Sequence, residues 1–178
     1  MESRRERFRR LMEPVHVRCA AFARGLARSR ADGDDLYQES VLRAYERLDG
    51  LRDDGAFRTW LFRIVVTVHR NRVRSAFWRR WSPFHAHDER LEKDYRTNDS
   101  PEAAEAARRA REALATLPAV QREAIVMFEI EGMTVDEIAA IQGVSASAVK
   151  SRLARGRDRL RAHYGGTAVP VAIPGDST

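Results

Sequence analysis

The chain has 178 residues, of which 43% are hydrophobic and 33% charged, with a net charge of +6 and a pI near 10.2. This length allows one domain or two small ones, and the positive charge favours an anionic partner such as nucleic acid or an acidic membrane surface. A single cysteine, Cys19, excludes an intramolecular disulfide, and no apolar run is long enough to cross a bilayer. No apolar segment follows the arginine-rich start, so we expect no signal peptide and a cytoplasmic protein.

Charge is segregated along the first part of the chain. Acids dominate from Asp32 to Ala56, whereas residues 58–80 carry seven arginines and no acid. Apolar residues recur with helical spacing from Phe57 to Val68, and a preceding helix presents its own apolar side from Leu36 to Leu48. With a third apolar segment at Val15–Leu26, these predict a compact helical unit.

A polar stretch bounded by Ser82-Pro83 and Ser100-Pro101 separates this unit from a second one. A loop of this length inside one compact domain is unusual, so we expect an extended linker between two small helical domains. The predicted boundaries are a first domain at 1–80, a linker at 81–104, a second domain at 105–164 and a disordered tail at 165–178. No β-alternation is sustained, and the predicted fold class is all-α.

The second unit has the pattern of a helix-turn-helix. Thr134, with Glu137 three residues later, forms a capping box that starts a short helix. Gly143 closes that helix, and Ser145 caps a longer basic one. The pairing of a short helix, a glycine turn and a basic helix favours binding to DNA.

The basic helix has one buried edge and one face suited to a groove. Val149, Leu153 and Leu160 supply the apolar edge, which is too sparse for a membrane-surface helix. Gly156 costs about 1 kcal/mol of helix stability relative to alanine, so it either loosens the helix or permits a close approach. The residues that can reach base edges or phosphates are Ser147, Lys150, Ser151, Arg152, Ala154 and Arg155.

The first unit carries two further candidate surfaces. Polar residues form one stripe of the helix from Phe57 onward: Arg63, Thr67, Arg70, Asn71 and Arg74. Arginines interleaved with hydroxyl and amide groups near tryptophans suit a strand with unpaired bases, although packing alone would explain Trp60. On the preceding helix Leu42 is expected to face outward among polar groups, which indicates a protein contact.

Two segments resemble conserved regions of bacterial RNA polymerase sigma factors. Residues 34–74 resemble region 2 and read DDLYQESVLRAYERLDGLRDDGAFRTWLFRIVVTVHRNRVR. Residues 114–161 resemble region 4 and read LATLPAVQREAIVMFEIEGMTVDEIAAIQGVSASAVKSRLARGRDRLR. There is no room for the first and third regions of primary sigma factors, and the short linker is typical of the extracytoplasmic-function (ECF) subfamily.

The resemblance implies a sigma factor that binds core RNA polymerase and directs promoter recognition, DNA melting and transcription initiation. It implies contacts with the β′ clamp helices and the β flap, and an anti-sigma factor as a further partner. The implied clamp-binding residues are Asp35, Gln38, Glu39, Leu42 and Arg43. The loop Leu48–Ala56 is implied to capture an unpaired −10 base, with Leu51, Arg63, Thr67, Arg70, Asn71 and Arg74 as the −10 contacts. The basic helix is implied to read the −35 element.

Other classes of protein fit the sequence less well. No phosphate-binding loop or nucleophile–base pair is present, and His85-x-His87-Asp88 lacks the spaced ligands of a metal site, so we expect no enzyme, metal or cofactor. A stand-alone helix-turn-helix regulator that binds duplex DNA as a dimer is the alternative, although it would not need the two charged helices of the first unit. Cys19 is either a redox switch or, more commonly for such a position, packed and inert.

Overall fold

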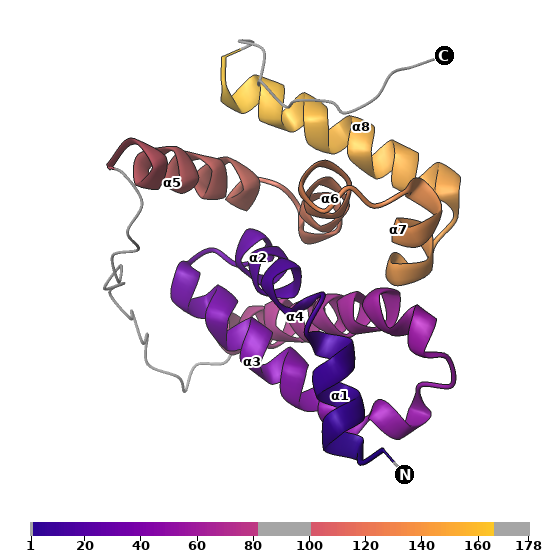
Figure 1. The fold of residues 1–178 in the computed structure, drawn as a ribbon. Coiled ribbons are helices and arrows are strands. Elements are labelled where there is room, and N and C mark those ends of the chain that lie inside the picture. Colours follow the sequence, from indigo (N-terminus) through magenta and orange to yellow (C-terminus); the bar gives the residue numbers. More distant parts are fainter. Residues whose placement is uncertain (1, 82–100, 166–178) are drawn as a thin grey trace.

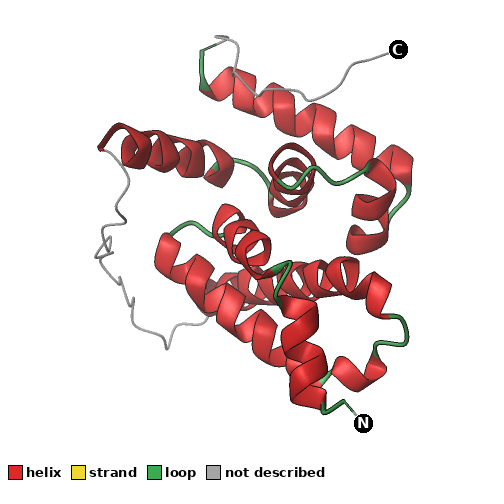
Figure 2. Ribbon diagram, viewed as in Figure 1, coloured by secondary structure: helices red, strands yellow, loops and turns green. Residues whose placement is uncertain are grey.

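The computed structural model describes residues 2–81 and 101–165, with side chains except those of 76–81, 103 and 104 (Figure 1). Within these ranges all regular structure is helical and no strand occurs, which confirms the predicted all-α class (Figure 2). The elements are α1 (Arg4–Met12), α2 (His16–Leu26), α3 (Arg30–Glu46), η1 (Leu48–Gly50), η2 (Asp54–Ala56), α4 (Phe57–Trp81), α5 (Pro101–Ala115), α6 (Ala119–Ile125), η3 (Val126–Ile130), α7 (Val135–Gln142) and α8 (Ala146–His163). The segment 82–100, within the predicted linker, and the tail from 166 lie outside the description.

The first half, α1 to α4, is built on the apolar stripe of α4. Phe22 of α2 and Phe62 of α4 are fully buried, with ring centroids 4.7 Å apart. Phe8 of α1 meets Tyr45 and Phe57 edge-on, which fixes α1 across the ends of α3 and α4. Burying a side chain of this size stabilises the fold by about 1.5–3 kcal/mol.

The second half consists of α5 to α8. α5 begins at Pro101, ahead of the predicted boundary at 105, because proline suits the first position of a helix, where its missing N–H costs nothing. α6 continues into the π-helical turn η3, in which the Glu131 amide donates to the Val126 carbonyl at 3.1 Å. α8 packs along α6 and α7 (Figure 1).

The two halves pack directly against each other. α4 lies against α7, and α2 lies against α6 and η3 (Figure 1). The buried Arg122 of α6 donates to the Leu26 carbonyl at the end of α2, at 2.8 Å. One continuous set of buried apolar side chains therefore joins both halves. No helix in the described ranges is long and apolar enough to span a membrane.

Candidate nucleic-acid interface

The helix-turn-helix predicted from the sequence is present in α7 and α8. Thr134 and Glu137 form the capping box: the Glu137 amide donates to the Thr134 hydroxyl at 3.2 Å, and the Thr134 amide donates to the Glu137 carboxylate at 2.8 Å. Gly143 ends α7 with φ +67°, a left-handed conformation that glycine adopts without strain. Ser145 then caps α8.

The faces of α8 divide as the sequence predicted. Val149, Leu153 and Leu160 are buried against the other helices. Among the groove-reading candidates, Ser147, Lys150, Ala154 and Arg155 are exposed, and Ser151 and Arg152 are half-buried. This arrangement leaves a polar, positively charged face of α8 open to solvent.

Two arginines on α8 already have partners within the chain. Arg152 donates to the Gln142 side-chain oxygen at 2.8 Å, which ties α8 back to the end of α7. Arg155 donates to the Ser151 hydroxyl at 2.6 Å and stays exposed. The Arg155 contact is local and solvent-exposed, whereas Arg152 bridges to the other helix of the motif.

Gly156 is buried where α8 crosses α6. A Cβ atom at this position would lie 2.9 Å from Ile125 Cγ1 and 3.2 Å from its Cδ1. The glycine therefore permits a close approach between the two helices, which decides between the two roles that the sequence left open.

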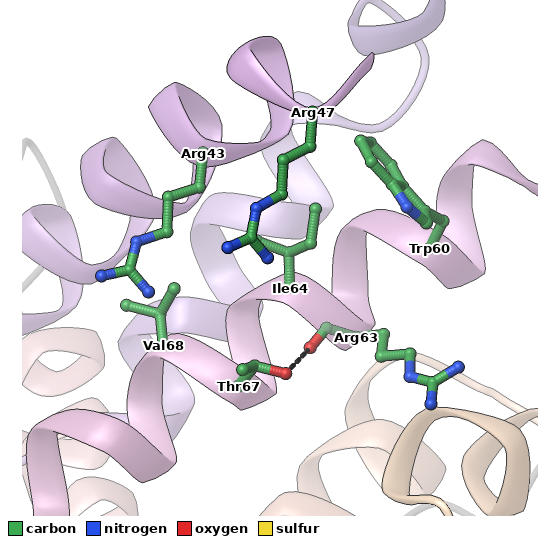
Figure 3. A pocket seen from close by; sticks show the side chains of 7 residues that line it. All are labelled: Arg43, Arg47, Trp60, Arg63, Ile64, Thr67 and Val68. Atoms are coloured by element: carbon green, nitrogen blue, oxygen red, sulfur yellow. Dashed lines mark hydrogen bonds between the residues drawn. The ribbon is translucent and has the colours of Figure 1, made fainter. Parts of the chain in front are cut away.

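A pocket of about 270 Å³ lies between α3 and α4 (Figure 3). Its floor is the apolar surface of Ile64 and Val68, and the half-buried indole of Trp60 lies at one end. Arg43 of α3 and Arg47, the residue that follows α3, reach over it, whereas the Arg63 guanidinium points away from them (Figure 3). The lining residues are Arg43, Arg47, Trp60, Arg63, Ile64, Thr67 and Val68.

The polar groups of this pocket differ in their availability. The Thr67 hydroxyl donates to the Arg63 carbonyl at 2.7 Å, so towards the pocket it offers only its acceptor lone pairs (Figure 3). Arg43 pairs with Glu39 at 2.7 Å. The Arg47 guanidinium has no hydrogen-bond or ion-pair partner among the described residues. A flat aromatic group with acceptor atoms on its edge fits such a lining.

The polar stripe on α4 extends from this pocket. Arg63, Thr67, Asn71 and Arg74 are exposed, and Arg74 donates to the Asn71 side-chain oxygen at 3.0 Å. The tryptophans 78 and 81 near this stripe lie outside the described side chains.

Arg70, predicted to belong to the stripe, is turned towards the second half. Its Nη2 lies 2.6 Å from Oε2 of Glu123 in α6, and its Nε lies 3.1 Å from both carboxylate oxygens. Glu123 is fully buried and also accepts from Gln142 at 3.1 Å. Burial alone would raise the pKa of Glu123, but hydrogen bonds from His69 and Arg70 outweigh it and hold the pKa below its ordinary value. No short-range pattern in the sequence signals this contact.

The loop predicted to contact an unpaired base is anchored by its own apolar residue. Leu51 is only 6% exposed, so its side chain belongs to the core of the first half. Arg52, Asp53 and Gly55 in the same loop are exposed. Any contact from this loop to a ligand therefore comes from these neighbours or from the backbone.

The predicted polymerase-binding residues lie on the outer face of α3. Leu42 is 58% exposed, as expected, and Asp35 and Gln38 are exposed beside it. Glu39 is occupied by Arg43 and by Arg72 of α4, whose Nη2 lies 2.6 Å from its carboxylate. The surface therefore consists of the exposed Leu42 with polar and acidic side chains beside it, and Arg72 of α4 holds Glu39 in place.

No cluster of three metal-binding side chains occurs in the described part of the chain, and His85, His87 and Asp88 fall outside it. Cys19 is fully buried in α2. Burial, together with the nearby Glu131 carboxylate, raises the pKa of its thiol to about 12. The thiol is therefore protonated and inaccessible at neutral pH.

Comparison with known proteins identifies both halves. Residues 11–79 match the family described as sigma-70 region 2, and residues 107–160 match sigma-70, region 4. The ECF RNA polymerase sigma factor SigM of Mycobacterium tuberculosis is 34% identical over 153 residues, covering 86% of this chain and 74% of the relative. The sigma factor CnrH of Cupriavidus metallidurans is 35% identical over 166 residues, covering 87% of this chain and 85% of the relative.

Solved structures agree in fold. CnrH in complex with the cytosolic domain of CnrY matches with a TM-score of 0.66 and 29% identity, over 90% of this chain and 89% of that one. The sigma factor RpoE in complex with the anti-sigma factor NepR, from Bartonella quintana, matches in fold with a TM-score of 0.74 over 90% and 98% of the two chains, at 24% identity. The α4 surface, the helix-turn-helix and these matches together place the chain in the ECF family of RNA polymerase sigma factors.

Proposed function

We propose that this protein binds core RNA polymerase and directs it to promoters, where its two halves do different work on the DNA. We assign these two DNA-binding roles to two domains, at residues 1–80 and 105–164, which are joined by the segment 81–104. The observation that supports the proposal is the presence of two distinct surfaces in one chain, each of which we assign to DNA. One is the exposed basic face of α8, and the other is the base-sized pocket beside α4.

The second domain is proposed to bind the duplex −35 element through α8. In this proposal Lys150 and Ser151 meet base edges, and Arg155 contacts a phosphate. Ala154 is small and exposed, which lets the helix sit deep in the major groove. Ser147 lies near the N-terminus of α8, and Arg152 acts mainly by holding the motif together. Because phosphate contacts release counterions, this binding should weaken steeply with salt.

The first domain is proposed to capture an unpaired −10 base in the pocket of Figure 3. The Trp60 ring offers a surface for stacking, and Thr67 an acceptor for the edge of the base. Asn71, Arg63 and Arg74 follow along α4 for the strand next to the base. Extruding a base costs a few kcal/mol, which these contacts and the bound polymerase would offset.

The outer face of α3 is proposed to bind the β′ clamp helices, with Leu42 as its apolar contact and Asp35, Gln38, Glu39 and Arg43 around it. A matched structure has its sigma factor bound to the anti-sigma factor NepR. By that likeness we propose that this chain also has an anti-sigma partner. The work of the protein is then binding, with no bond chemistry of its own.

Transcription in vitro tests the proposal. Core polymerase is incubated with fragments of the source genome, with and without the protein. Initiation at defined start sites only when the protein is present supports a sigma factor. Tight binding of the protein alone to duplex DNA, with no initiation, would instead support a dimeric helix-turn-helix regulator.

A further inference from the structure

The N-terminal helix α1 clamps the loop at residues 47–56 through arginines on one of its faces. Arg7 donates from Nε and Nη2 to Asp54 Oδ1, at 3.0 and 2.6 Å, and from Nη2 to the Leu51 carbonyl at 2.9 Å. Arg10 donates to the other oxygen of Asp54 at 2.9 Å. Both carboxylate oxygens of Asp54 are thus held from α1, and these hydrogen bonds lower its pKa.

The same helix also holds the chain where α3 ends. Arg4 donates to the carbonyls of Tyr45 and Glu46, and its guanidinium lies 5.1 Å from the centre of the Tyr45 ring. The last carbonyls of a helix lack partners within the helix and carry partial negative charge, so a cation is favourable there. Hydrogen bonds from α1 therefore hold the chain on both sides of Arg47, at Tyr45 and Glu46 before it and at Leu51 and Asp54 after it.

This loop connects two walls of the base-sized pocket. Arg47 precedes η1 and Trp60 lies in the first turn of α4, and both line the pocket. The loop has few contacts of its own: Leu51 is buried, and Asp53 accepts from the Gly55 amide at 2.9 Å. Leu48 is also buried, and backbone hydrogen bonds close the turns at Gly50, Leu51 and Ala56. Among the described residues, the side-chain hydrogen bonds and ion pairs that tie this loop to another helix all come from α1.

We propose that Arg7, supported by Arg4 and Arg10, is a positioning residue for base capture. It holds the loop so that Arg47 and Trp60 stay at the separation that admits one unpaired base. The inference rests on the proposed function, because it concerns the pocket assigned to the −10 base. A loop that is already ordered loses less conformational entropy when DNA binds, which raises affinity and sharpens the choice of base.

The geometry favours Arg7 over its neighbours. Two nitrogens of Arg7 donate to the Asp54 carboxylate, so the hydrogen bonds between them are charge-assisted. The pair is half-buried, with the two side chains 27% and 34% exposed. Arg9, on the opposite side of α1, is exposed and its side chain makes no hydrogen bond or ion pair with the described residues. Arg9 therefore provides a matched control on the same helix.

The test uses holoenzyme assembled from core polymerase and each variant of the full chain. The probes are fluorescently labelled single-stranded oligonucleotides carrying the non-template −10 sequence, with each of the four bases in turn at the captured position. Arg7→Ala should weaken binding of the preferred oligonucleotide roughly five- to tenfold and reduce its discrimination between bases. Arg9→Ala should match wild type. Asp54→Asn should behave like Arg7→Ala, and the double variant should be no worse than either alone.

Arg7→Lys provides a variant that keeps the charge and the fold. Because lysine is a point charge without the planar fork, it should restore core binding and melting temperature fully but base discrimination only in part. If the wild type discriminates between bases and Arg7→Ala discriminates equally, the positioning role is overturned, whatever the loss of stability. If the wild-type holoenzyme itself shows no preference, the proposed function fails and the inference fails with it.

Discussion

Arg70 of α4 and Glu123 of α6 form an ion pair across the two halves, with Nη2 2.6 Å from Oε2. The pair joins an arginine of the proposed −10 stripe to a fully buried carboxylate of the other half. In this arrangement the Nε and Nη2 groups of Arg70 are engaged with protein and are not available to a phosphate.

Substitution of Glu123 should loosen the packing between the halves. Glu123→Ala removes the buried acceptor that His69, Arg70 and Gln142 share, so the free energy of unfolding should fall by about 1–3 kcal/mol. Urea denaturation followed by circular dichroism measures the change. Glu112→Ala, which removes an exposed pair with Arg108, is the control and should stay within about 0.5 kcal/mol of wild type. Equal effects of both substitutions on the free energy of unfolding would show that the buried pair does not stabilise the packing between the halves.

The same carboxylate predicts a dependence of stability on pH. The pKa of Glu123 is lower in the folded protein than its ordinary value of about 4.3, so the folded state favours the ionised form. Its contribution is complete above the unfolded pKa and is lost as the pH falls from there through the folded pKa. The free energy of unfolding of Glu123→Gln, measured across the acidic range, should therefore fall less on acidification than that of wild type. Parallel curves would contradict the lowered pKa.

Gly156→Ala should destabilise the second domain although alanine is the better helix former. The added Cβ would lie 2.9 Å from Ile125 Cγ1, and overpacking of this kind costs about 1–3 kcal/mol, against about 1 kcal/mol gained in helix propensity. In a double-mutant cycle, Ile125→Ala combined with Gly156→Ala should lose less stability than the sum of the single substitutions. Additive losses, or a stabilised single variant, would mean that the helices do not approach so closely.

Substitutions on α8 should separate base reading from phosphate binding. Lys150→Ala should cost holoenzyme about 1–3 kcal/mol on its preferred −35 duplex and relax the preference at one base pair. Arg155→Ala should weaken binding to all duplexes alike. It should also reduce the slope of the logarithm of affinity against the logarithm of salt concentration by about 1, the value for one phosphate contact. Arg161→Ala, an exposed arginine near the end of α8 that pairs with Asp158, serves as control. If Arg161→Ala matched Arg155→Ala, the basic face would act only through its total charge.

Local chemistry made much of this fold predictable from the sequence. The capping box at Thr134, the turn at Gly143 and the buried edge of α8 depend on residues within a few positions of one another. The exposed Leu42 followed from helical periodicity in the same way. Such features are set by short-range sterics and hydrogen bonds, which a sequence displays directly.

The contacts missed from the sequence join residues distant along the chain. Arg70 meets Glu123 and Arg7 meets Asp54 only because helices fold back on each other. The buried Leu51 shows the same limit, since its loop position indicates exposure while the packing of the first half covers it. Packing between the halves decides the position of Arg70, and packing within the first half decides those of Arg7 and Leu51. Periodicity does not carry that information.

The most direct measurement of the central claim is footprinting of promoter DNA with two reagents: DNase I, which reports protection of the duplex −35 element, and permanganate, which detects unpaired thymines. It compares wild-type holoenzyme with a Thr67→Ala/Asn71→Ala variant and with Lys150→Ala. We predict reactive thymines near −10 for wild type, retained −35 protection without reactive thymines for the first variant, and loss of −35 protection for the second. Reactive thymines undiminished in the Thr67→Ala/Asn71→Ala variant, or a full footprint from the chain without core polymerase, would contradict the account.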